Sequence, residues 1–245
     1  MLGSVRLDEV GLRYPNGTQA VEGFSLAVSK GEFVAIVGPS GCGKSSVLRM
    51  VAELQTPTSG LVERTAGDRT AFVFQEPNLL PWKTVVDNVA LPLSLAGVPP
   101  SEVRTAVAAS IARVGLSGFG EHFPRELSGG MKMRASLARA MVSAPNTLLL
   151  DEPFAALDEM TRLRLQEDLL SLQAESGLTA LFVTHSVFEA VYLADRVVVT
   201  TARPARVVQV FPVELPRPRP KEIRSTPEYA AVVGRVIAAL REQQP

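Results

Sequence analysis

The sequence predicts an α/β fold with a parallel central sheet, and two observations support this prediction. Short apolar runs without periodicity, typical of strands covered on both faces, occur at residues 33–37, 147–150 and 179–184. Each run is followed by a segment with the capping residues or the amphipathic pattern of a helix. Strands that alternate with helices in this way form parallel sheets with helices on their faces.

The chain before the first apolar run has a different pattern. Residues 5–14 and 18–28 alternate between apolar and polar side chains, and they flank Asn16-Gly17, a strong signal for a β-hairpin. We therefore expect an antiparallel β subdomain at the N-terminus.

Residues 85–144 interrupt the alternation of strands and helices. A glycine-rich stretch after residue 37 leads into a helix, and residues 71–75 form a further strand. From residue 85 the character becomes mainly helical, with Ser101 as the expected N-cap of one helix. We interpret this stretch as an inserted helical subdomain.

The second half of the chain returns to strands and helices. Asp158 is expected to cap an amphipathic helix, and residues 186–189 have the pattern of a capping box that opens another helix. Residues 195–211 suggest a closing hairpin. The predicted α/β domain therefore spans residues 1–212.

The C-terminal part, residues 213–245, is predicted to be separate from this domain. PRPRP at residues 216–220 is typical of an extended linker. Thr226-Pro227 then starts a last helix, because proline is favoured at the first helical position.

Composition limits the class of protein. The 25 Lys and Arg residues balance the 25 Asp and Glu residues, so the net charge does not indicate a nucleic-acid-binding protein. No uncharged apolar run reaches transmembrane length, and Arg6, Asp8 and Glu9 are not compatible with a signal peptide. A single cysteine cannot form an internal disulfide, which fits a reducing compartment. We expect a cytoplasmic protein.

GPSGCGKS at residues 38–45 has the pattern of a phosphate-binding loop between a strand and a helix. Its glycines allow successive backbone N–H groups to face phosphate oxygens at a helix N-terminus. Lys44 can reach the β- and γ-phosphates, and Ser45 can bind Mg²⁺. The alternative is a chance glycine turn, which the strand–loop–helix context disfavours. The candidate nucleotide-binding residues here are Gly38, Pro39, Ser40, Gly41, Cys42, Gly43, Lys44, Ser45 and Ser46.

Polar residues follow three other predicted strands, at the sheet edge where ligands bind in parallel sheets. Asp151 can hold Mg²⁺ through water, and Glu152 can orient or deprotonate an attacking water. His185 can contact the γ-phosphate or that water, and Gln75 can bind Mg²⁺ or water. Alternatively, the two acids only start a turn before Pro153, and the histidine and glutamine are ordinary polar residues at strand ends.

Three further features allow either a structural or a functional interpretation. Tyr14 is a core residue or an aromatic ring that stacks on a purine. Asp158 has a sufficient explanation as an N-cap. In LSGG, Ser128 is a good N-cap, and Gly129 and Gly130 leave helical N–H groups uncovered. This helix end is either a plain helix start or a second anion site.

Taken in order, these motifs resemble those of the ATP-binding subunit of an ABC transporter. GPSGCGKS matches Walker A, FQEP the Q-loop, LSGG the family signature, LLLDEP Walker B, ALD the D-loop and VTH the switch histidine, over roughly residues 4–210. The resemblance implies a P-loop NTPase with the ABC ATPase domain, and ATP and Mg²⁺ as ligands. The implied catalytic residues are Lys44, Glu152 and His185, and the implied metal ligands are Ser45, Gln75 and Asp151.

The same resemblance implies a homodimer. In this family two subunits are arranged head to tail, and LSGG of one closes over the ATP held by Walker A of the other. Ser128, Gly129 and Gly130 would therefore contact the γ-phosphate of the partner's ATP, and Asp158 would cross the interface. Tyr14 matches the aromatic residue that stacks on adenine.

Finer features resemble one branch of the family. FQEPNLLPWKTVVDNVALPL and LSGGM are similar to the subunits that serve nitrate, sulfonate and taurine importers. This implies ATP-driven uptake of a small, anionic solute through permease subunits, indirectly with a solute-binding protein, at the cytoplasmic face of a membrane. Residues 78–84 would lie near the coupling helix of the permease.

Two residues of the motifs need a separate comment. Met131 stands where glutamine is commoner in the family, and methionine is frequent there in the branch named above, so we do not interpret it as inactivating. Cys42 lies near a helix N-terminus and Lys44, and both favour the thiolate. We therefore expect thiol reagents to inhibit ATP hydrolysis and bound MgATP to protect.

Two alternatives exist within the wider family, a non-transport ATPase and an exporter subunit, and the sequence argues against the first. A non-transport ATPase that acts on DNA would need a long coiled coil between Walker A and the signature, and residues 46–127 are too few for one. Ribosome-associated relatives usually carry two such domains in one chain, whereas this sequence has one set of the motifs. An exporter subunit is compatible with all the motifs. The solute is not encoded in this chain, because its selectivity lies in other subunits.

Overall fold

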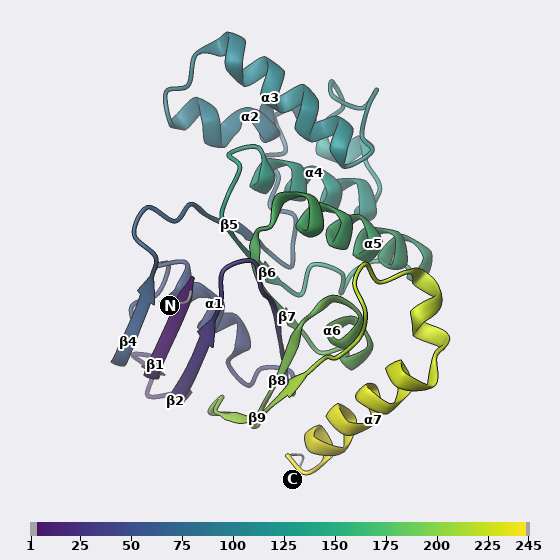
Figure 1. The fold of residues 1–245 in the computed structure, drawn as a ribbon. Coiled ribbons are helices and arrows are strands. Elements are labelled where there is room, and N and C mark those ends of the chain that lie inside the picture. The colour runs from purple at the N-terminus through teal and green to yellow at the C-terminus, as the bar shows by residue number, and fades with distance from the viewer. Residues whose placement is uncertain (1–3, 244–245) are drawn as a thin grey trace.

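The computed structural model describes residues 4–243, so residues 1–3 and 244–245 of the two predicted domain ranges lie outside the described residues. Within them the chain forms a three-stranded and a six-stranded sheet, with helices around them (Figure 1). The larger sheet is parallel from β5 to β8, and its edge strand β9 is antiparallel to β8. The predicted α/β fold is therefore confirmed. In spatial order its strands are β5 (Thr70–Val73), β6 (Thr147–Asp151), β7 (Thr179–Thr184), β3 (Phe33–Val37), β8 (Arg196–Thr200) and β9 (Val207–Pro212).

The smaller sheet contains the predicted N-terminal hairpin. β1 (Val5–Arg13) pairs antiparallel with β2 (Gln19–Val28), and Gly17 in the turn between them has a φ of 84°. A third strand, β4 (Ser59–Arg64), pairs with the other side of β1 and was not predicted. Its side chains are exposed or only half-buried, so β4 lacks the alternation of apolar residues that reveals a strand.

The helical stretch forms a group of helices that contains α2 (Val85–Leu95), α3 (Pro100–Arg113), the 3₁₀ turn η1 (Pro124–Glu126) and α4 (Gly129–Met141). In this helical group, α2 and α3 lie at the top of Figure 1, farther from the larger sheet than α4, which lies between them and α5 (Glu159–Ser176). The predicted cap of α3 is wrong: the helix begins at Pro100 and Pro99 is its N-cap, so Ser101 lies inside the first turn. Proline suits that turn because its φ is already helical. No helix within residues 4–243 is both long and apolar enough to cross a membrane.

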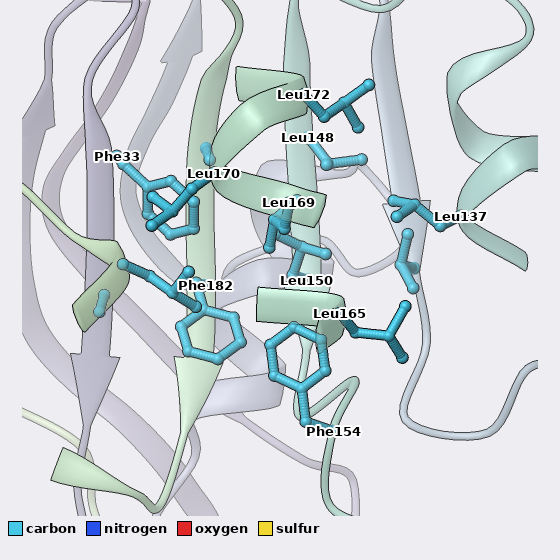
Figure 2. Close-up of a cluster of buried hydrophobic side chains, with 14 of the residues drawn as sticks. Phe33, Leu137, Leu148, Leu150, Phe154, Leu165, Leu169, Leu170, Leu172 and Phe182 are labelled. Atoms are coloured by element: carbon cyan, nitrogen blue, oxygen red, sulfur yellow. The ribbon is translucent and has the colours of Figure 1, made fainter. Parts of the chain in front are cut away.

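One face of the larger sheet is covered by α5 (Glu159–Ser176), α6 (Val187–Leu193) and α4. Figure 2 shows leucines of α5 beside Leu148 and Leu150 of β6. Phe182 of β7 contacts the rings of Phe33 and Phe154, with centroid distances of 6.2 and 5.7 Å. Each fully buried leucine or phenylalanine stabilises the fold by about 1.5–3 kcal/mol. This apolar layer keeps the strands in one sheet.

The other face of the sheet packs against α1 (Lys44–Val51) and the smaller sheet. Leu149 lies between Leu148 and Leu150 in sequence but belongs to this second cluster, because side chains alternate between the faces of a strand. Ile36 of β3 and Val47 and Leu48 of α1 belong to it as well. The phosphate-loop segment between β3 and α1 is therefore held at both ends by buried side chains.

The proline-rich segment after β9 has a bend at residues 217–218, and it is packed on the α/β domain instead of forming a free spacer. Arg219 is 6% exposed, and its Nη1 donates hydrogen bonds to the carbonyl groups of Val191, Tyr192 and Ala194 at the end of α6. Burial lowers the pKa of Arg219 to about 10, so the guanidinium is still protonated at neutral pH. A cation at a helix C-terminus satisfies carbonyl groups that lack partners within the helix.

The last helix packs on the same part of the molecule. After η2 (Lys221–Ser225), the predicted cap Thr226 accepts a hydrogen bond from the Tyr229 backbone N–H at the start of α7 (Pro227–Arg241). The Tyr229 hydroxyl donates to the Phe188 carbonyl oxygen in α6 at 2.7 Å. Burial raises the pKa of Tyr229 to about 12, which keeps that hydroxyl a donor. Residues 217–241 thus contact the helix that follows His185.

The predicted capping box before α6 forms only in part. Ser186 accepts a hydrogen bond from the backbone N–H of Glu189, as a capping residue does. The carboxylate of Glu189 instead accepts a hydrogen bond from the Thr184 hydroxyl at 2.6 Å. Burial raises the pKa of Glu189, and the hydrogen bond from Thr184 opposes that rise.

Arg219→Ala should lower the free energy of unfolding by about 3 kcal/mol, because several buried carbonyl groups at the end of α6 lose a charged donor. Urea denaturation followed by circular dichroism measures this change. Arg241→Ala is the matched control, since Arg241 is exposed in the same C-terminal segment. Equal stability of the two variants would mean that the proline-rich segment is only a spacer.

Candidate functional site

The loop at residues 38–45 joins the end of β3 to the start of α1. Gly41 and Gly43 have φ values of 70° and 123°, which side-chain-bearing residues rarely adopt. A Cβ atom on Gly43 would clash with the carbonyl oxygen of Ala20, and one on Gly38 with the hydroxyl of Thr200. The loop is therefore built from bare backbone at these positions, as an anion-binding nest requires.

Lys44 curls back across this loop. Its side chain is 3% exposed, and its Nζ donates to the carbonyl oxygens of Gly38 and Pro39, each at 2.8 Å. The ammonium group has no carboxylate within ion-pair distance among the described residues. Its positive charge is therefore available to an anion that enters the loop.

Ser45 and Asp151 provide two oxygen atoms side by side. The Ser45 hydroxyl donates to Oδ1 of Asp151 at 2.7 Å, across the interface between α1 and β6. Burial raises the pKa of Asp151, whereas the hydrogen bond from Ser45 and the charges of Arg49 and Lys44 oppose that rise. Hard divalent cations prefer such oxygen ligands. No group of three His, Cys, Asp or Glu residues gathers in the described part of the chain, so a cation here would need water or phosphate to complete its shell.

Glu152 and His185 lie together next to this pair. Nδ1 of His185 is 2.9 Å from Oε2 of Glu152. Glu152 has a φ of 45°, an uncommon left-handed conformation, and its N–H donates to the Val183 carbonyl oxygen at 2.9 Å. Such strain is concentrated at functional sites, where the surrounding structure enforces it. A carboxylate beside an imidazole at a phosphate loop can accept a proton from a water molecule.

These groups line or adjoin a pocket of about 320 Å³. Tyr14 and Glu152 both line this pocket, and the Tyr14 hydroxyl is 2.9 Å from the Ser46 hydroxyl. Arg203 also lines it and was not predicted from the sequence. The residue lies in the turn between β8 and β9, and no local pattern connects it with the loop. The pocket is lined by Tyr14, Asn16, Thr18, Ala20, Gly41, Gly43, Lys44, Ser45, Ser46, Glu152 and Arg203.

Gln75 does not lie in the wall of this pocket. β5 ends at Val73, two residues before the end of the predicted strand, and Gln75 is exposed in the segment that leads to the helical group. Of the loop residues, Pro39 contributes a carbonyl group to Lys44, and Ser40 is exposed.

The LSGG segment forms a second cluster that shares no residue with the pocket wall. Ser128 caps α4 by accepting a hydrogen bond from the Met131 N–H at 3.3 Å. A Cβ atom on Gly130 would clash with the side chain of Thr161 in α5. Asp158 caps α5 by accepting from the Thr161 N–H at 3.0 Å, and this bonding lowers the pKa of Asp158. The signature glycines and Asp158 therefore belong to one surface of the chain, with the start of α4 packed on α5.

Cys42 is less accessible than the sequence suggests. Its side chain is 1% exposed, and its Sγ lies 3.5 Å from the Thr200 hydroxyl and 3.9 Å from Nζ of Lys44. A thiol reagent can reach it only when the loop opens. The expected inhibition by thiol reagents depends on that opening.

Comparison with known proteins finds a matching family model and similar sequences that cover the whole chain. A family model described as ABC transporter matches residues 21–155. A putative ATP-binding protein of Brucella abortus is 44% identical over 253 residues, which cover 100% of this chain and 96% of the relative. An aliphatic sulfonates import ATP-binding protein, SsuB 1 of Pseudomonas syringae, is 44% identical over 226 residues, or 92% of each protein. The nitrate import ATP-binding protein NrtC of Synechocystis is 42% identical over 258 residues, 100% of this chain and 38% of NrtC.

Solved structures have the same fold. A dimeric ATP-binding cassette in a post-hydrolysis state, bound to ADP and Pi, superposes with a TM-score of 0.77 at 31% identity and covers 86% of this chain and 99% of its own. The cbiO1 protein of Clostridium perfringens, part of an ABC transporter complex, has a TM-score of 0.78 at 26% identity over 99% of this chain and 100% of its own.

Proposed function

This chain belongs to the ABC transporter family, and we propose that it powers the uptake of a small anionic solute through partner permease subunits. As an ABC ATPase it converts ATP and water to ADP and phosphate. The observation that carries the proposal is the group formed by the phosphate loop, the Ser45–Asp151 pair and the Glu152–His185 pair around one pocket.

We assign the roles of these residues from their chemistry. The backbone N–H groups of residues 38–45 and the Lys44 ammonium would hold the phosphates of ATP. Ser45 and Asp151 would hold Mg²⁺, which neutralises phosphate charge when it is bound. Gln75, which is exposed outside the pocket, would need to move toward the nucleotide to join them.

We assign activation of the attacking water to Glu152. In this step the water oxygen bonds to the γ-phosphorus, the bond from that phosphorus to the bridging oxygen breaks, and a water proton passes to the Glu152 carboxylate. The hydrogen bond to His185 orients that carboxylate. Tyr14, which lines the same pocket, would stack on the adenine ring.

The separation of two half-sites in one chain supports a homodimer. The phosphate loop and the LSGG cluster share no pocket wall, although each lies at the N-terminus of a helix, α1 and α4 respectively. In a head-to-tail pair, Ser128, Gly129 and Gly130 of one copy would close over the ATP of the other, with Asp158 across the interface. A two-fold axis would then complete two equal sites.

Apolar surface on the helical group supports docking to a permease. Trp82 is 70% exposed, and a groove of about 430 Å³ lies between α2 and α3 with Val86, Ala90 and Val103 among its lining residues. Large exposed apolar groups mark interaction sites. We propose that residues 78–84 and this groove receive a cytoplasmic helix of the permease, which places the chain peripherally on the cytoplasmic face of the membrane.

A side chain of the signature helix connects this docking surface with the LSGG cluster. Arg139 of α4 donates to the carbonyl oxygens of Asn78 and Pro77, each at 2.8 Å. Because α4 begins with the signature glycines, movement of α4 upon dimer closure would displace residues 77–78. This is a direct mechanical path from ATP binding to the permease.

The relatives that import sulfonates and nitrate support an anionic solute. Sulfonates, nitrate and taurine carry charges that a binding protein can select. The selectivity itself belongs to the permease and the solute-binding protein.

Glu152→Gln should bind ATP within about twofold of the wild type and lose hydrolysis by at least about a hundredfold, because an amide cannot accept the water proton. Binding is measured by calorimetry and hydrolysis by phosphate release. Glu175→Gln is the matched control, since Glu175 is exposed and pairs with Arg113. Near-normal hydrolysis by Glu152→Gln would refute its role as the base.

Purification of the tagged chain from its native membranes should recover permease subunits, and an importer of this class should also bring a solute-binding protein. Trp82→Ser should reduce the recovery of permease. Leu54→Ser, which changes an exposed apolar residue elsewhere on the chain, should not. Thermal-shift measurements on the recovered solute-binding protein with nitrate, taurine and alkanesulfonates then identify the solute. Recovery of a permease that functions without any binding protein would contradict import.

A further inference from the structure

Arg203 donates hydrogen bonds to the phosphate loop from a distant part of the sequence. Its Nε and Nη2 both donate to the carbonyl oxygen of Gly41, at 2.9 and 2.5 Å. The side chain is exposed at the pocket, and no carboxylate in residues 4–243 lies within ion-pair distance of it. In contrast, Arg206 of the same turn pairs with Glu22 at 2.6 Å. The charge of Arg203 is therefore directed at the loop and not at an internal partner.

The turn that carries Arg203 is firmly attached to β2. The Ala205 N–H donates to the Ala20 carbonyl oxygen at 2.9 Å, and the Glu22 N–H donates to the Ala205 carbonyl oxygen at 3.1 Å. The hydroxyl of Thr201 donates to the Pro204 carbonyl oxygen at 2.6 Å. A turn held in this way can present the guanidinium in one fixed orientation.

Two hydrogen bonds to one carbonyl oxygen fix the peptide plane between Gly41 and Cys42. In a trans peptide the carbonyl group and the next N–H point in opposite directions. The Cys42 N–H accordingly points toward the Pro39 carbonyl oxygen, which it meets at 3.4 Å, and that oxygen also accepts from Lys44. At this length the hydrogen bond is weak, so the N–H can exchange it for one to a phosphate oxygen.

We propose that Arg203 is a positioning residue of the phosphate loop. It holds the carbonyl group of Gly41, and with it the peptide plane of the Cys42 N–H, within the loop that receives the phosphates, and its positive charge at the pocket favours the polyphosphate. This inference rests on the proposed binding of ATP. Gly41 has a left-handed φ and no side chain, so this peptide is held by its own hydrogen bonds: the two that Arg203 donates to its carbonyl group and the weak one that the Cys42 N–H donates to Pro39.

The test is the binding of ATP, ADP and adenosine to the full chain, by calorimetry for the nucleotides and ligand-observed NMR for adenosine. Arg203→Ala should raise the Kd for ATP and ADP about tenfold, the effect of losing one charge-assisted pair of hydrogen bonds. Adenosine has no phosphate, so its Kd should not change. KM for ATP should rise, and kcat at saturating ATP should stay within about twofold.

Two substitutions separate hydrogen bonding from charge. Arg203→Lys keeps the charge and one donor, so it should recover part of the affinity. Arg203→Gln keeps a donor without the charge, so its affinity reports the hydrogen bond alone. Arg206→Ala is the matched control from the same turn and should bind all three ligands like the wild type.

Each other outcome has a distinct meaning. Unchanged Kd values for ATP and ADP in Arg203→Ala would overturn the proposal, and so would an equal loss for adenosine, which would indicate general support of the pocket. Failure of the wild-type chain to bind ATP would instead contradict the proposed function.

Discussion

The register of three parallel strands, β6, β7 and β3, is the constraint on which the site depends. Val37 at the end of β3 lies opposite Thr184 at the end of β7, and Asp151 at the end of β6 lies opposite Val183 of β7. The three strands therefore end within one residue of each other along the sheet. The phosphate loop, Glu152 and His185 come directly after these ends, so they must meet at one edge of the sheet. A slip of two residues would displace a side chain by about 7 Å and separate Glu152 from His185. The leucines and phenylalanines in Figure 2 hold this register because both faces of the strands are buried.

Further contacts connect this edge with the rest of the molecule. Helix α6 begins just after His185, and the C-terminal segment holds it through Arg219 and Tyr229. On the opposite side, α4 carries the signature glycines at its start and contacts residues 77–78 through Arg139. The pocket proposed to bind the nucleotide therefore adjoins elements that also contact other parts of the chain.

Patterns within a short stretch of sequence predicted most of this arrangement. The phosphate loop, the acids after β6 and the hairpin at the N-terminus all depend on neighbouring residues, which a sequence shows directly. β4 was missed because an exposed edge strand has no apolar alternation, and the cap of α3 was misplaced because Pro100 already satisfies the first turn. Arg203 could not be found, because 162 residues separate it from the loop residue that it contacts. The left-handed φ of Glu152 likewise follows from the packed fold and from no local pattern.

The central claim is that each catalytic site is shared between two copies of the chain. Mixing Lys44→Ala with Ser128→Arg, each inactive alone, tests it directly by the release of phosphate. In a head-to-tail heterodimer one site then has an intact phosphate loop and an intact signature, so the mixture should recover up to about a quarter of the wild-type rate. If every site lay within one chain, both variants would stay inactive when mixed, and that result would contradict the account.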